Sequence, residues 1–201
     1  IPRSQRLVFF FFRLNLGCVN WDVLKEHPDI IRGGGTLDQV GAGDADLHLL
    51  ATHCAIGECD VFLSHSWRDD GWLKWDKLTE WCEKFREMHG RAPNIWLDKL
   101  CIDQTNISAD LECLPVFLSG CKGILVLAGT TYMTRLWCIV ELFVFFSIQE
   151  AAQVGEDVSQ RATFEMIPVA KDEEELGKVW NTWLRAFDAR KCECFVKADK
   201  E

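Results

Sequence analysis

The sequence predicts an α/β fold in which five strands form an open parallel sheet with helices on both faces. From residue 59 onward, short apolar segments suited to strands alternate five times with longer segments whose apolar residues have helical spacing. Residues 124–128 are apolar at every position, which is typical of a strand buried on both faces of a parallel sheet. Residues 176–187 carry the clearest helical stripe.

The first half of this region predicts two strands, at 61–63 and 95–97, with a helix between them over about 71–89. Gly90 and Pro93 are suited to ending this helix. Its apolar side chains recur at steps of three or four residues, at Trp75, Leu78, Cys82 and Phe85.

The second half continues the alternation. Three further helices are expected over about 111–121, 135–149 and 176–187. Three further strands are expected at 124–128, 164–169 and 192–197, the last at the edge of the sheet. Pro115 falls inside the first of these helices, so this helix either begins late or bends there. We expect a flavodoxin-like sheet with the strand order 2-1-3-4-5.

Residues 1–57 have a different character. Glycines cluster between two weakly helical patches, at 21–31 and 47–54. This pattern favours an appendage or linker in front of an α/β domain that occupies residues 58–201. Because the first residue is Ile1 rather than Met, we expect the chain to be a segment of a longer protein.

Charge and hydropathy exclude two classes of protein. Lys and Arg number 22 against 31 Asp and Glu, giving a net charge of -9, and they form no basic run of the kind that binds nucleic acid. The apolar run at residues 7–12 is six residues long, whereas a membrane-spanning helix needs about 20. We interpret it as a buried strand or the edge of a helix, with the remnant of a span cut upstream as the alternative, and we expect no membrane span within this segment.

The ten cysteines include no C-x-x-C pair, so the sequence contains neither a zinc ribbon nor a thioredoxin-type site. We interpret them as reduced packing residues of a cytoplasmic protein. His53, Cys54 and Cys59 could be considered as metal ligands, but a fourth ligand is not evident, and we expect no metal.

Glu141 is the residue that most suggests chemistry. It is the only charged residue between positions 136 and 148, and its helical neighbours are aromatic or aliphatic. A carboxylate in such surroundings is costly to bury unless something binds it, and carboxylates of this kind are often functional. The alternative is a core helix whose single Glu reaches a basic partner or solvent.

Two polar loops support a site near Glu141. In open α/β sheets ligands bind beyond the carboxyl ends of the strands, where the strand order reverses. In the expected order, the loops at this point are 64–70 and 129–136, and the second leads directly into the helix of Glu141. A third loop, 98–104, mixes charged and apolar residues and is expected to be structured. Helix capping and salt bridges are the alternative roles for these loops. No P-loop, dinucleotide-binding fingerprint or nucleophile elbow is present.

Three segments resemble known families. Residues 59–67, CDVFLSHSW, resemble the opening strand of Toll/interleukin-1 receptor (TIR) domains, and residues 135–142, RLWCIVEL, resemble the W-C-x-x-E-L stretch of plant-type TIR domains. Residues 95–107, IWLDKLCIDQTNI, are closer to the TIR-related fungal heterokaryon incompatibility (HET) domain, which also has a W-x-x-x-E-L element. The resemblance covers about residues 59–197.

This resemblance implies an intracellular signalling or defence domain that hydrolyses NAD to nicotinamide and plain or cyclic ADP-ribose, with NAD as substrate rather than cofactor. Glu141 matches the catalytic glutamate of the NAD-cleaving members. The same match implies that Trp137 flanks the site, that Ser64 and Arg68 lie near the ribose or phosphates, and that Asp98 and Lys99 lie near the loop that closes over it.

Two other functions stay open. Many relatives are adaptors, so the chain could be a non-enzymatic module that signals by self-association with TIR-like domains. It could also be a nucleotide-binding sensor without turnover, which calorimetry with NAD and ATP would distinguish.

Overall fold

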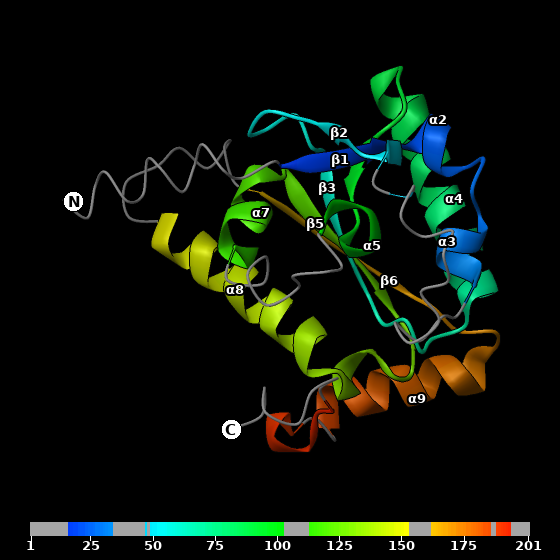
Figure 1. Ribbon diagram of the computed structural model, residues 1–201. Helices are drawn as coiled ribbons and strands as arrows, with labels where there is room; N and C mark the ends of the chain where they lie inside the picture. The colour runs from blue at the N-terminus through cyan, green and yellow to red at the C-terminus, as the bar shows by residue number, and fades with distance from the viewer. Residues whose placement is uncertain are drawn as a thin grey trace.

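The computed structural model describes residues 16–33, 47, 49–102, 113–152, 162–185 and 188–193. They form an α/β structure around one six-stranded mixed sheet with the order β2-β1-β4-β3-β5-β6 (Figure 1). The strands are β1 (Gly17–Asn20), β2 (Thr52–His53), β3 (Val61–His65), β4 (Asn94–Trp96), β5 (Gly123–Ala128) and β6 (Thr163–Pro168).

The predicted α/β class with a mostly parallel sheet is confirmed, but the predicted five-stranded flavodoxin-like sheet is wrong. Strands β4, β3, β5 and β6 are parallel and adjacent in the relative order expected for the first four predicted strands. Two antiparallel strands extend the sheet: β1 pairs with β4, and β2 pairs with β1. Both come from residues 1–57. The glycine-rich composition of this region gave no indication of two very short strands.

The predicted fifth strand, 192–197, does not extend the sheet in the part of the chain that the structure describes. Glu193 forms an isolated parallel bridge with Arg135, just before α8, and β6 is the last described strand at that edge. Residues 194–197 lie outside the described residues.

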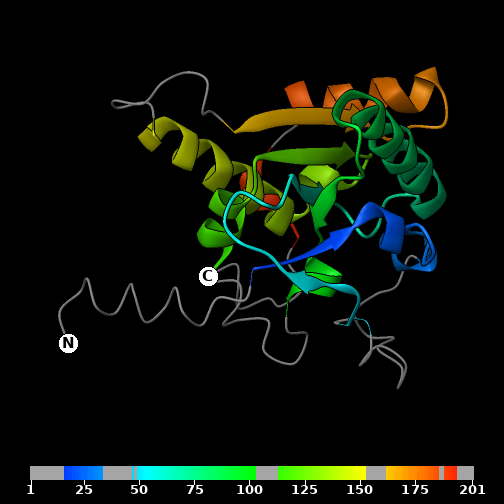
Figure 2. The same ribbon diagram turned by 90° about the horizontal axis from the view of Figure 1, so that it is seen from above.

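Helices cover both faces of the sheet, as predicted (Figure 2). The helices are α2 (Trp21–Leu24), α3 (Asp29–Arg32), α4 (Gly71–His89), α5 (Asp98–Cys101), α7 (Leu114–Gly120), α8 (Leu136–Ala152) and α9 (Glu173–Arg185), with the 3-10 turns η3 (Tyr132–Thr134) and η5 (Ala189–Lys191).

The side chain of Asp70 accepts hydrogen bonds from the backbone N–H groups of Trp72 and Leu73 and so begins α4, which ends at Gly90 with φ of 69°. Helix α7 begins at Leu114 with Pro115 in its first turn, so the late start is the alternative that holds.

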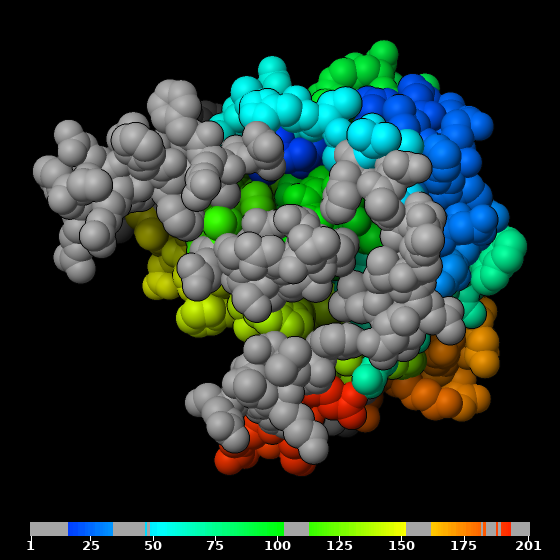
Figure 3. All heavy atoms as spheres, in the orientation of Figure 1, coloured from blue at the N-terminus to red at the C-terminus, as the bar shows by residue number. Residues whose placement is uncertain are grey.

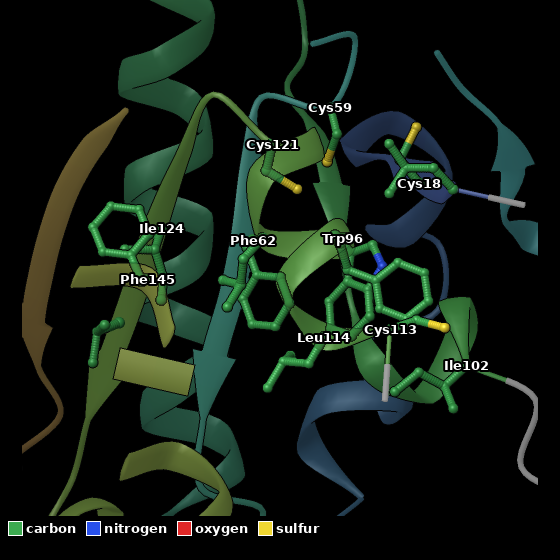
Figure 4. Packing of buried hydrophobic residues seen from close by; sticks show 14 of the residues in the cluster. Cys18, Cys59, Phe62, Trp96, Ile102, Cys113, Leu114, Cys121, Ile124 and Phe145 are labelled. Atoms are coloured by element: carbon green, nitrogen blue, oxygen red, sulfur yellow. The ribbon is translucent and has the colours of Figure 1, made fainter. Parts of the chain in front are cut away.

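Alternation along β3 separates two apolar layers. Val61 and Leu63 pack with α2, α3 and α4, whereas Phe62 packs with α7 and α8. Figure 4 shows the second layer, in which the rings of Phe62 and Trp96 stack with centroids 4.2 Å apart and the thiols of Cys59 and Cys121 point toward each other. Because Ser64 lies two residues after Phe62, it faces the same side as α8.

The described part of residues 1–57 packs into the same core as the later strands. Val19, Trp21 and Leu24 are buried in the layer of Val61 and Leu63. Figure 3 shows the blue and cyan atoms of this region lying directly against the green atoms of the later elements. The sheet therefore draws on residues from both sides of position 57.

Two further observations concern sequence features. None of the helices in the described ranges combines the length and apolar character that crossing a bilayer requires. The nine described cysteines are free thiols, whereas Cys194 and the apolar run 7–12 lie outside the described residues.

Candidate functional site

The loops that follow β3 and β5 are bound together at the carboxyl ends of these strands. The carboxylate of Asp69 accepts hydrogen bonds from the Gly129 N–H at 3.1 Å, the Thr131 N–H at 2.9 Å and the Thr131 hydroxyl at 2.8 Å. The hydroxyls of Ser66 and Thr131 add a further hydrogen bond of 2.7 Å. The sequence prediction that these two loops face each other is confirmed, and the second loop leads through η3 into α8.

Helix α8 brings Glu141 to the end of the central strand β3. The hydroxyl of Ser64 donates a hydrogen bond to Oε2 of Glu141, and the same hydroxyl oxygen lies 2.6 Å from the hydroxyl of Tyr132. One turn earlier on α8, the thiol of Cys138 donates to the carbonyl of His65 at 3.5 Å. The helix is therefore held against the strand at Glu141 and one turn before it.

The carboxyl of Glu141 has no cationic partner among the described residues. Burial raises its pKa to about 8, the hydrogen bond from Ser64 acts in the opposite direction, and the nearby charge of Asp98 adds to the increase. None of the ion pairs in the described ranges includes Glu141. The interpretation of Glu141 as a core residue paired with a basic group is therefore not supported there.

Asp98 is the second carboxyl of the site. It begins α5, directly after β4, and its Oδ2 accepts a hydrogen bond of 3.0 Å from the indole N–H of Trp67. Its Oδ1 accepts one of 2.7 Å from the Lys99 N–H. Burial raises the pKa of Asp98, and these bonds oppose the increase. Ser64, Asp98 and Glu141 thus share one site between β3, α5 and α8.

Trp67 connects the loop after β3 to α5 and is surrounded by charged and polar groups. The ammonium groups of Lys74 and Lys99 lie 5.5 and 5.8 Å from the centroid of its ring. The ring of His65 meets it edge-on with centroids 4.2 Å apart. Lys99, a predicted site residue, therefore reaches the site through Trp67.

Two predicted site residues are not joined to this group by any contact that the structure describes. Arg68 forms an ion pair with Glu193, and both side chains are more than half exposed. Trp137 is half-buried in the first turn of α8, one turn before Glu141. The predicted residues 103 and 104 of the third loop lie outside the described residues.

Three buried polar residues were not singled out from the sequence, although the predicted loops 64–70 and 129–136 contain two of them, His65 and Tyr132. Tyr132 and Lys74 have no exposed surface, and His65 is 7% exposed. Lys74 donates to the carbonyl of Ser66 at 2.7 Å, and burial lowers its pKa to about 8. A signal for Lys74 existed as well, because Lys74 precedes Leu78 by one helical turn and so lies on the buried face of α4.

The described residues contain no group of three or more His, Cys, Asp or Glu side chains arranged to hold a metal ion. Comparison of the chain with protein-family models, curated proteins and solved structures finds no match.

Proposed function

We propose that this chain is a TIR-like signalling or defence domain that cleaves NAD at the bond between nicotinamide and ribose, with Glu141 as the catalytic carboxylate. The observation that carries this proposal is the carboxyl of Glu141 itself, which Ser64 holds at the end of β3 and which lacks a cationic partner among the described residues. A half-buried carboxyl in apolar surroundings is stabilised by a ligand that supplies positive charge.

The chemistry of NAD fits such a carboxyl. Its nicotinamide ring is positively charged, and this charge would favour the ionised form of Glu141. When the bond between nicotinamide and ribose breaks, its electron pair moves to the ring nitrogen and a neutral base leaves. The positive charge then develops on the ribose as an oxocarbenium-like centre, which a carboxylate stabilises or traps, as in glycoside hydrolysis. Because the leaving group is neutral, one carboxylate suffices without a general acid.

The other site residues have supporting roles in this proposal. Ser64 orients Glu141, and Asp98 adds negative charge that strengthens the attraction for a cationic ring. Trp67 fixes the orientation of Asp98. Contacts of Arg68, Lys99 and Trp137 with the substrate rest on the family resemblance. The nine free thiols support the proposed cytoplasmic location, where thiols remain reduced.

Release of nicotinamide from NAD by the purified chain tests the proposal. The measurement covers a range of protein concentrations, because activity in catalytic relatives depends on assembly. The Glu141→Gln variant keeps an acceptor for Ser64 and should lose at least about 100-fold in turnover, since it removes the charge that stabilises the transition state. The matched variant Glu150→Gln, at an exposed position of the same helix, should retain full activity. Turnover that persists in Glu141→Gln would disprove the assignment.

A surface feature favours the second candidate, a non-enzymatic module that acts by self-association. Phe143 and Phe146 of α8 and Phe164 of β6 are 71%, 50% and 40% exposed, and the rings of Phe146 and Phe164 lie 5.2 Å apart. Exposed aromatic side chains in one cluster are typical of interaction surfaces. Assembly that is lost in a Phe143→Ser, Phe146→Ser double variant, with no NAD turnover in the assembled wild-type chain, would favour this function over catalysis.

A further inference from the structure

A chain of hydrogen bonds runs from Tyr132 through Ser64 to Glu141. The hydroxyl oxygens of Tyr132 and Ser64 lie 2.6 Å apart, and the Ser64 hydroxyl meets Oε2 of Glu141. The three side chains come from η3, β3 and α8, and both Tyr132 and Ser64 have no exposed surface. The ring of Tyr132 also stacks on Trp183 of α9, with centroids 5.4 Å apart and planes 18° apart.

The number of available protons determines which group donates and which accepts in each of these hydrogen bonds. A serine hydroxyl carries one proton, and an ionised carboxylate can only accept. When Glu141 is ionised, Ser64 therefore donates to it, and Tyr132 donates to Ser64. When Oε2 of Glu141 carries a proton, both directions reverse, and the Tyr132 hydroxyl turns toward the carbonyl of Cys138 at 3.5 Å. The position of the Tyr132 proton thus depends on the protonation of Glu141.

We infer that Tyr132 is a positioning residue, which directs the Ser64 hydroxyl at Glu141 and so favours the ionised carboxylate that NAD cleavage requires. The inference rests on the proposed function of Glu141. Without the Tyr132 hydroxyl, the oxygen of Ser64 loses a buried donor, and the proton of Ser64 is free to turn away from the carboxylate. Hydrogen bonds in such a chain also strengthen one another, because each donor polarises the next.

Among the described residues, few titratable groups act on the hydrogen-bonded residues Tyr132, Ser64 and Glu141. Glu141 faces Asp98 from α5 and Cys138 from its own helix, and the charge of Lys74 on α4 acts on both of these groups. Arg135, just before α8, acts on Cys138. Burial raises the pKa of the Tyr132 phenol well above its usual range, so Tyr132 itself stays protonated near neutral pH. A change in the Tyr132 signal near neutral pH therefore reports the titration of a neighbouring group.

The protein contains one tyrosine, so the NMR signal of a labelled tyrosine reports Tyr132 alone. Protein grown with tyrosine labelled with carbon-13 at Cζ gives one signal, whose chemical shift is followed between about pH 6 and 9. We expect a titration with a midpoint near 8, the pKa of Glu141. It should vanish in Glu141→Gln and be strongly reduced in Ser64→Ala, while Glu150→Gln leaves it unchanged. A signal that does not titrate, or one that titrates equally in Glu141→Gln, would overturn the inference.

A second arm uses Tyr132→Phe, which removes the hydroxyl but keeps the ring on Trp183. The acid limb of the pH profile for NAD cleavage should move to higher pH by about half to one unit, because the carboxylate loses support. An unmoved acid limb would contradict the inference even if total activity falls. If the chain does not cleave NAD, the proposed function fails alone, and the resonance of Tyr132 still decides whether the hydrogen-bond chain operates.

Discussion

Asp69, in the loop after β3, binds both the backbone N–H and the hydroxyl of Thr131, in the loop after β5, at 2.9 and 2.8 Å. The third acceptor contact of Asp69, to the Gly129 N–H, brings the two loops so close that a Cβ at position 129 would lie 2.2 Å from Cγ of Asp69. These contacts fix η3 and the start of α8 relative to β3. The relative positions of Ser64, Tyr132 and Glu141 therefore depend on Asp69.

Replacement of Asp69 by Ala should destabilise the chain by about 2–4 kcal/mol, because buried donors on Gly129 and Thr131 lose their acceptor. Urea denaturation measures this free energy of unfolding. The control variant Asp76→Ala, on the exposed face of α4, should change it by less than about 0.5 kcal/mol. Equal stability of the two variants would show that the two loops are held together by other contacts.

Glu141 should make the stability of the chain depend on pH. Its carboxyl has a pKa of about 8 in the folded chain against an ordinary value of 4.5. Between these values the folded state binds a proton that the unfolded state has lost, so stability falls as pH rises from 4.5 to about 8. The Glu141→Gln variant lacks this titration. It should match the wild-type chain near the lower value and exceed its stability by about 1–3 kcal/mol at the upper one.

Denaturant unfolding of both proteins at several pH values provides the measurement. The difference between wild type and variant is the relevant quantity, because it cancels the titration of buried groups on which Glu141 does not act, such as His65. Glu150→Gln should give a difference of less than about 0.5 kcal/mol throughout. If the difference between wild type and Glu141→Gln stays constant across the range, Glu141 is ionised in the folded chain at neutral pH.

A large part of the site could be predicted from the sequence because a few patterns were unambiguous. An uninterrupted apolar run predicted the buried strand β5, and an amphipathic stripe predicted α4 with its ends at Gly71 and His89. The rule that parallel strands end at one edge of the sheet then placed Ser64 and Glu141 together. The single charge in an apolar helix indicated which residue of α8 to examine.

Other parts of the structure had no periodic signal. Strands β1 and β2 contain four and two residues, too few to show alternation, and only the pairing of β1 with β4 and of β2 with β1 makes them strands. The hydrogen bonds of Tyr132 depend on a 3-10 turn of three residues, which leaves no helical stripe. Long-range polar contacts such as these arise only when the chain has folded, so the sequence could single out the carboxyl of Glu141 but not the residues that orient it.

Gly71 shows how closely the N-terminal region packs on the rest of the chain. It is the first residue of α4, and a Cβ there would lie 2.4 Å from the carbonyl oxygen of Arg32 and 2.8 Å from its Cα, at the end of α3. The guanidinium of Arg32 lies 4.2 Å from the ring centroid of Trp72. Without a glycine at this position, the end of α3 could not lie so close to the start of α4.

Gly71→Ala should therefore destabilise the chain by about 1–3 kcal/mol, because backbone atoms rather than a flexible side chain must move. Gly177→Ala is the matched control. Gly177 lies inside α9, and a Cβ there would meet no atom within 4 Å, so alanine should stabilise the chain by about 0.5–1 kcal/mol through its helix propensity. Urea denaturation of both variants gives the two signs. A stabilising Gly71→Ala would mean that the end of α3 does not rest on the start of α4 in solution.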